Sequence, residues 1–222
     1  MNWNEISTVL LDMDGTLLDL HFDSHFWQTY VPEHYALTRG LDVETSHKIL
    51  GPIFKKHEGT LNWYCLDFWS KELDIDVAEL KKDVAHLIAI KEGALEFLAQ
   101  LRKHNIRTVL VTNAHPDSLA LKLEHTRLDN HLDRLISAHE LGLPKEEVLF
   151  WKALQTAEPY TPHQTLLIDD NLHALHSAKE FGIKHLLAAC HPDSQRPPKE
   201  TDEFISFHTF GELLQSLDEG RY

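Results

Sequence analysis

The sequence has little cysteine and no long apolar run. Cys65 and Cys190 are the only cysteines in 222 residues, too few and too far apart for a disulfide framework, and no zinc-ligand spacing surrounds them. No uninterrupted apolar stretch reaches the roughly eighteen residues of a transmembrane helix. A secretory signal has a basic stretch followed by an apolar segment, and the first residues of this sequence do not show that pattern. We therefore expect a globular protein of the cytoplasm.

Positive charge is also scarce. Lysine and arginine number 21 against 35 acidic residues, which gives a formal net charge of -14. Nucleic acid and anionic membranes select basic surfaces, so we expect neither as a partner. A small phosphorylated metabolite stays compatible with this balance, because a divalent ion and one lysine can supply local positive charge. The 17 histidines form neither a His-Glu-x-x-His pattern nor a Cys/His ligand array.

Two carboxylates directly follow a short apolar run. Residues 9–11 are typical of a buried strand, and Asp12 and Asp14 come next, ahead of Gly15, which allows a sharp turn. Ligands of open α/β sheets bind beyond the carboxyl ends of strands. There Asp12 can attack phosphorus to form an aspartyl-phosphate, and Asp14 can move the proton. The plainer interpretation is an Asp-Gly turn with two surface acids.

Further polar residues follow other predicted strands. Residues 107–111 lead into Thr112 and Asn113, and residues 165–168 lead into a pair of aspartates. Lys145 is predicted just inside a helix start marked by a proline. Each has a plain alternative: a β-forming threonine, a solvated lysine and helix-capping aspartates. Their joint order favours function. The polar residues at these strand ends and at the helix start are Thr112, Asn113, Lys145, Asp169 and Asp170.

These motifs, in this order, resemble the haloacid dehalogenase superfamily of hydrolases. The resemblance implies a phosphatase that uses Mg²⁺, an ion that prefers hard oxygen ligands. Its expected ligands are Asp12, the backbone carbonyl of Asp14, and Asp170, with Asp169 helping directly or through water. Thr112, Asn113 and Lys145 would bind the phosphate, and Lys145 would offset the repulsion between carboxylate and phosphate.

Strand and helix patterns alternate except in one segment. Residues 1–19 and 91–222 predict an α/β, Rossmann-like core of three layers around a parallel sheet. Residues 20–90 predict helices only, which we interpret as an inserted helical cap. In the superfamily it resembles, such a cap covers the active site and carries substrate selectivity. The helices expected in the cap span residues 25–35, 43–49, 61–73 and 77–90.

The predicted cap contains an aromatic segment at residues 61–70. Its rings could line a pocket or pack the cap's own core. This segment and the residues after Val111 resemble the bacterial purine 5'-nucleotidase branch, the GMP/IMP nucleotidases. The resemblance implies hydrolysis of purine nucleoside 5'-monophosphates. The residues of the cap that we expect to contact substrate are Trp63, Asn62 and Trp27, with His57 and Arg39 as further candidates.

Other activities remain open. Haloacid dehalogenation would need neither Asp14 as an acid nor the second aspartate pair. A phosphatase or mutase acting on a sugar phosphate or phosphoglycolate would keep the same motifs and differ in the cap. A phosphonatase would need a cap lysine close to Asp12, and none has a supporting motif. A non-catalytic binding protein of the same fold would be expected to have lost one of the chemical residues. The sequence predicts no oligomeric state.

Overall fold

A computed structural model describes residues 2–219 of the chain. Its centre is a six-stranded sheet of order β3-β2-β1-β4-β5-β6, and all its pairings are parallel. The first strand lies between the second and the fourth, and each of its residues is buried. The strands are β1 (Thr8–Leu11), β2 (Arg107–Thr112), β3 (Arg134–Ser137), β4 (Thr165–Asp169), β5 (His185–Ala189) and β6 (Ser206–Phe207).

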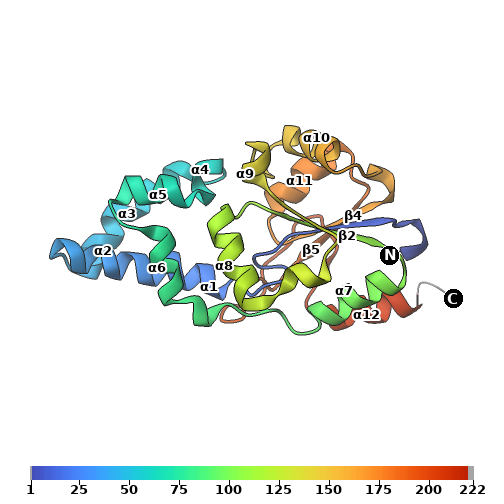
Figure 1. Ribbon diagram of the computed structural model, residues 1–222, viewed down its shortest axis with the longest axis horizontal. Helices are drawn as coiled ribbons and strands as arrows, with labels where there is room; N and C mark the ends of the chain where they lie inside the picture. Colours follow the sequence, from blue (N-terminus) through green and yellow to red (C-terminus); the bar gives the residue numbers. More distant parts are fainter. Residues whose placement is uncertain (1, 220–222) are drawn as a thin grey trace.

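Helices cover both faces of the sheet (Figure 1). Successive side chains of a strand point to opposite faces, so Val9 and Leu11 pack into one apolar cluster and Leu10 into another. The predicted three-layer α/β fold is confirmed. The elements outside the sheet are η1 (Trp3–Glu5), α7 (Ala94–Lys103), α8 (Pro116–Thr126), η4 (Leu128–His131), α9 (Ala138–Leu141), α10 (Val148–Ala157), η5 (Pro162–Gln164), α11 (Leu172–Phe181) and α12 (Phe210–Glu219).

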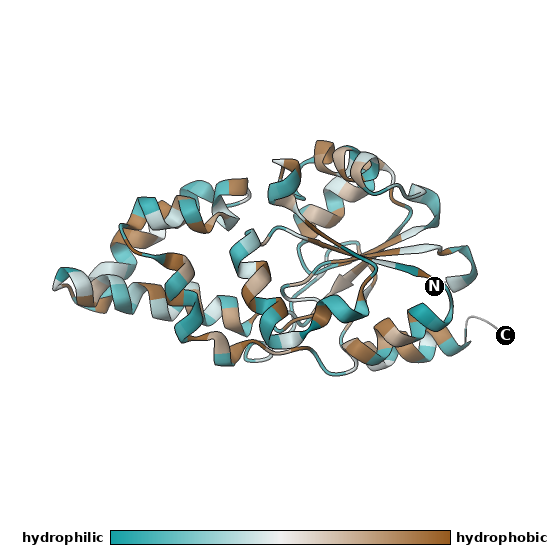
Figure 2. Ribbon diagram, viewed as in Figure 1, coloured by the Kyte–Doolittle hydropathy of each residue, from teal (hydrophilic) through white to brown (hydrophobic). Residues whose placement is uncertain are grey.

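Residues 21–87, which we call the helical segment, lie at the side of the sheet (Figure 1). Figure 2 shows apolar residues beside polar ones on its helices, and its buried residues form a cluster of their own. The segment thus has a separate small core. Its elements are α1 (His21–His25), the π-helical turn η2 (Phe26–Tyr30), α2 (Val31–Arg39), α3 (Val43–His57), α4 (Leu61–Tyr64), α5 (Leu66–Leu73), α6 (Val77–Asp83) and η3 (Ala85–Leu87).

The chain enters and leaves the helical segment along two adjacent stretches. The amide of Asp19 donates to the carbonyl of Ala89, and that of Lys91 donates to Leu17, both at 2.9 Å. These bonds place the two ends of the helical segment next to each other. Two adjacent stretches of chain therefore join the segment to the core. Within residues 2–219 no helix is long and apolar enough to cross a membrane.

The helix predicted over residues 25–35 belongs to the longer run of α1, η2 and α2, and the one predicted over 77–90 ends as an α-helix at Asp83. Two further helices of this segment also differ from the prediction. Helix α3 continues to His57 through Pro52, where a stop was expected, because Ile53 and Phe54 pack against the segment's core. The helix expected over residues 61–73 is broken at Cys65, whose backbone is extended. Its sulfur accepts a hydrogen bond from the amide of Phe68 at 3.4 Å and thereby caps α5.

Lys145 lies in a turn before α10 and not inside a helix. Its amide donates to the side chain of Asn113 at 2.9 Å, and its carbonyl accepts from the hydroxyl of Ser177 at 2.5 Å. Both backbone groups are therefore used in tertiary contacts. A helix beginning at Pro144 would compete for the same carbonyl.

Candidate active site

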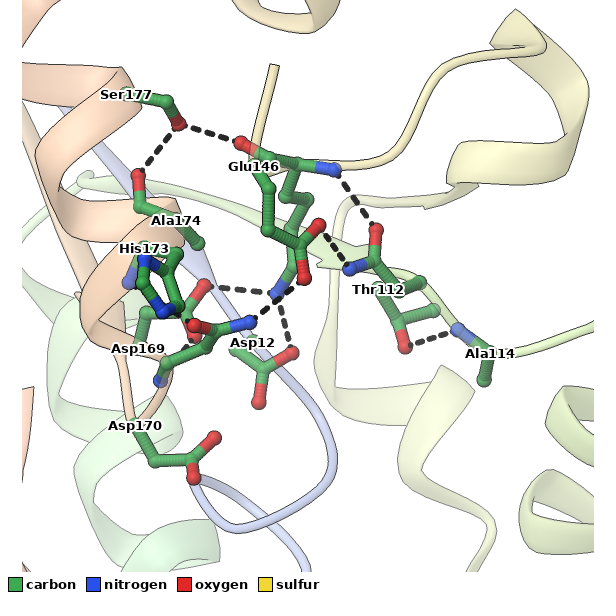
Figure 3. Close-up of polar contacts among 12 residues, drawn as sticks. Asp12, Thr112, Ala114, Glu146, Asp169, Asp170, His173, Ala174 and Ser177 are labelled. Atoms are coloured by element: carbon green, nitrogen blue, oxygen red, sulfur yellow. Dashed lines mark hydrogen bonds and ion pairs between the residues drawn. The ribbon is translucent and has the colours of Figure 1, made fainter. Parts of the chain in front are cut away.

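The ends of β1 and β4 bring three aspartates together. The amide of Asp12 donates to the carbonyl of Ile168 at 2.9 Å, which continues the pairing of the two strands past β1. Asp12, Asp169 and Asp170 each offer a carboxylate oxygen, and these oxygens lie within 4.8 Å of one another. We call these three residues the acidic cluster. Figure 3 shows their carboxylates gathered beside the strand ends.

Lys145 is the cation that joins two members of this cluster. Its Nζ lies 2.5 Å from Oδ1 of Asp12 and 2.7 Å from Oδ2 of Asp169, with only 2 % of the residue exposed. Burial alone would lower the pKa of Lys145, but the two carboxylates outweigh it and raise that pKa. The side chain therefore stays charged at neutral pH. Its two backbone contacts hold it in place.

The acidic cluster is short of positive charge. Burial raises the pKa of Asp12 and that of Asp170 to about 6, against the lowering effects of Lys145 and Lys199. Oδ2 of Asp12 is buried and has no hydrogen-bond partner. An unpartnered buried carboxylate oxygen among two further carboxylates suits a divalent cation. The all-oxygen donors fit Mg²⁺, so the residues present match the expected cofactor.

Gly15 allows the loop after β1 to approach the acidic cluster closely. Its φ is +92°, a conformation that residues with a side chain rarely adopt. A Cβ at this position would lie 2.7 Å from Cγ of Asp170. The glycine is therefore required both by the backbone and by the space next to the carboxylate.

Asp14 belongs to a network of two buried lysines and two partly buried aspartates that reaches the helical segment. Nζ of Lys122 lies 2.6 Å from both Asp14 and Asp23, and Nζ of Lys81 lies 2.5 Å from the other oxygen of Asp23. Burial raises the pKa of Asp14 to about 6, although Lys122 opposes the rise. A carboxyl with this pKa can hold a proton in one step and release it in the next. The network also ties α1 and α6 to α8.

Glu146 forms a second contact between the two parts. Its carboxylate accepts from the hydroxyl of Tyr64 at 2.5 Å. It also accepts from Nδ2 of Asn113 at 2.9 Å and from Nδ2 of Asn171 at 2.8 Å (Figure 3). The hydroxyl of Thr112 is buried and accepts from the amide of Ala114 at 3.0 Å. These bonds fix the two loops that flank Lys145.

A cavity of about 570 Å³ lies between the strand ends and the helical segment. All seven residues predicted at the strand ends and at the helix start before α10 line it. From the helical segment, Trp27 and Trp63 line it as well, and so does Tyr64. Of the other predicted contacts, Asn62 is exposed and does not line the cavity. His57 packs on the ring of Phe68.

The last candidate contact of the helical segment, Arg39, lies over the ring of Tyr35 and donates to the carbonyl of Leu73. It does not line the cavity either.

Sequence reasoning missed several residues of the site. Lys122 and Lys81 are lysines within helical patterns, where a solvated role is the ordinary expectation, and only tertiary pairing makes them buried ions. Glu146 directly follows Lys145, and this adjacency was a usable signal. Lys199, which pairs with Asp170 at 3.1 Å, lies between β5 and β6, where no motif marks it.

The site therefore combines the carboxyl end of a parallel sheet with an acidic cluster and a buried lysine. The sequence profile of haloacid dehalogenase-like hydrolases matches residues 6–182, and the chain belongs to this family. It is 40% identical over 215 residues to the GMP/IMP nucleotidase YrfG of Escherichia coli, covering 97% of each chain. It is 26% identical over 189 residues to the pyrophosphatase PpaX of Halalkalibacterium halodurans, covering 81% and 82%.

Solved structures share the fold. A HAD phosphatase from Thermococcus onnurineus superposes with a TM-score of 0.77 at 20% identity, covering 96% of this chain and 98% of that chain. The predicted membership in the superfamily and the resemblance to its purine nucleotidase branch are therefore confirmed, as is the assignment as a hydrolase.

Proposed function

We propose that the protein is a magnesium-dependent phosphatase that works through an aspartyl-phosphate on Asp12, with GMP or IMP as its preferred substrates. The observation that carries the chemistry is the acidic cluster around Lys145, with the buried and unpartnered Oδ2 of Asp12. The identity to a GMP/IMP nucleotidase over nearly the whole chain supports the substrate.

Four residues would hold Mg²⁺ in this proposal. Asp12 and Asp170 would bind it with their carboxylates, Asp14 would bind it with its backbone carbonyl, and Asp169 would contribute directly or through water. The bound ion would offset the negative charge of the phosphate and of the attacking carboxylate.

Asp12 and Asp14 have different roles in the two half-reactions. The Asp12 carboxylate attacks phosphorus while the bond to the ester oxygen breaks, and Asp14 gives its proton to that oxygen. Asp14 then takes a proton from water, whose oxygen attacks phosphorus and releases Asp12. Lys145, Thr112 and Asn113 would hold the phosphate oxygens. All of them line the same cavity.

The helical segment supplies the selectivity in this proposal. We infer that residues 20–90 are a cap, since the chain leaves and re-enters the core along one paired connection. Trp27 and Trp63 come from this segment and line the cavity, and flat bases stack on aromatic rings. Both rings also contact Trp69, so only the part of each ring that lines the cavity would serve the base.

A panel of substrates tests the proposal. Phosphate release would be measured for GMP, IMP, CMP, UMP, a hexose phosphate, phosphoglycolate and pyrophosphate, with Mg²⁺ and with excess EDTA. We expect the purine monophosphates to have the highest kcat/KM, and EDTA to abolish turnover until Mg²⁺ is restored. A higher kcat/KM for a sugar phosphate or phosphoglycolate would reject the nucleotide assignment, and full activity in EDTA would reject the metal. The cytoplasmic location stays a prediction.

A further inference from the structure

A cysteine and two histidines meet at a further junction between the helical segment and the core. Cys65 lies between α4 and α5, His115 precedes α8, and His139 lies in α9. One possible ligand atom from each lies within 4.8 Å of the other two. The three residues are far apart in sequence, so no ligand spacing reveals them. His115 also lines the substrate cavity.

His139 presents an available ring nitrogen. Its Nε2 is buried and has no hydrogen-bond partner, while its ring makes a hydrogen bond to the backbone of Asn113 that favours the protonated form. That bond therefore involves Nδ1, whose proton is donated to the carbonyl, and the lone pair is left on Nε2. Metal-binding histidines are usually held in this way. An orphaned buried nitrogen is otherwise unfavourable.

The other two side chains can take up compatible states. Nδ1 of His115 lies 3.7 Å from a carboxylate oxygen of Asp117, and Nε2 lies 3.7 Å from one of Asp67. In the structure Nδ1 accepts from the backbone amide of Asp117 at 3.3 Å. If Nε2 binds a cation, the ring proton moves to Nδ1, which gives up this bond and can donate instead to the carboxylate of Asp117. The amide of Phe68 donates to the sulfur of Cys65 at 3.4 Å and holds its direction.

We propose that Cys65, His115 and His139 form a second metal site, which takes Zn²⁺ or a similar thiophilic divalent cation. One sulfur and two imidazole nitrogens suit tetrahedral Zn²⁺, with water as the fourth ligand, and disfavour Mg²⁺. The acidic cluster has the opposite preference. Two cations of different chemistry are thereby sorted between two sites. This binding does not depend on the proposed phosphatase activity.

The position of the site predicts its consequence. Cys65 belongs to the helical segment, whereas His115 and His139 belong to the core. A cation bound by all three ties the α4–α5 junction to the loop after β2, beside the cavity. We expect bound Zn²⁺ to hold the helical segment against the core and to lower turnover.

Cobalt provides a direct probe, because a thiolate ligand gives Co²⁺ a charge-transfer absorption in the near ultraviolet that oxygen ligands do not give. Co²⁺ would be titrated into the whole protein in saturating Mg²⁺. We expect one equivalent to produce the band in the wild type. Cys65→Ser should remove it, His139→Gln should weaken Co²⁺ binding at least tenfold, and the matched control Cys190→Ser should keep it.

The controls separate the site from the acidic cluster. Zn²⁺ competition should remove the cobalt band in the wild type, and the same Zn²⁺ should inhibit the wild type and Cys190→Ser more strongly than Cys65→Ser. Circular dichroism would check that each variant is folded. A wild type without the band, or a band retained in Cys65→Ser, would overturn the proposed site. Equal Zn²⁺ inhibition of wild type and Cys65→Ser would overturn its effect on turnover.

Discussion

Replacing Gly15 by alanine should damage the proposed metal site through a single methyl group. The φ of +92° strains any side chain there, by about 1 to 2 kcal/mol. The new Cβ would also lie 2.7 Å from Cγ of Asp170, and overpacking of this kind costs about 1 to 3 kcal/mol. The total loss of unfolding free energy should be about 2 to 5 kcal/mol.

Gly40 is the matched control. It has a φ of +65°, but a Cβ added there would meet no heavy atom within 4 Å, so Gly40→Ala should show only the backbone strain of about 1 to 2 kcal/mol. Urea unfolding in EDTA would give both losses of stability. Calorimetric titration with Mg²⁺ should show at least tenfold weaker binding for Gly15→Ala and unchanged binding for Gly40→Ala. Equal stability losses with unchanged Mg²⁺ affinity would refute the reasoning.

Three further predictions concern the network, the selectivity and the metal. Lys122→Met removes the buried cation between two partly buried carboxylates and should lower the free energy of unfolding by about 3 to 5 kcal/mol. The exposed control Lys82→Met should change it by less than about 1 kcal/mol in the same urea titration. Trp63→Ala should reduce the purine preference in kcat/KM while p-nitrophenyl phosphate is hydrolysed nearly as before; an unchanged preference would remove Trp63 from base recognition. Mg²⁺ affinity should rise between about pH 5 and about pH 7, because a bound cation requires the ionised carboxylate and the pKa of Asp12 without metal is about 6. A calorimetric affinity that is flat over this range would contradict the raised pKa.

The fold and the strand-end residues could be predicted because each depends on local pattern. The apolar run before Asp12 requires a buried strand, and parallel pairing then brings its end beside that of β4. Asp12 and Asp169 consequently both form an ion pair with Lys145, although 157 positions separate them in the sequence. The resemblance to a known family supplied the order of the motifs.

The remaining residues depend on tertiary pairing that no local pattern records. Lys122 has both apolar and charged residues beside it in the sequence of α8. The burial of its side chain follows from the approach of α1 and α6 to this helix. The break at Cys65 was missed because its neighbours have good helical spacing. Trp63 was placed in the cavity by its aromatic character, whereas Asn62, one residue earlier, is exposed.

The covalent step on Asp12 is tested most directly by a rapid-mixing experiment with p-nitrophenyl phosphate and Mg²⁺. The nitrophenolate leaves readily without an acid, so Asp14→Asn should phosphorylate Asp12 and then hydrolyse it slowly. We predict a burst of nitrophenolate close to one equivalent per protein chain, with one phosphoryl group on the peptide that contains Asp12 after acid quench. Asp12→Asn should give neither burst nor turnover. Turnover by Asp12→Asn near the wild-type rate, with no phosphorylated peptide from Asp14→Asn, would contradict the account.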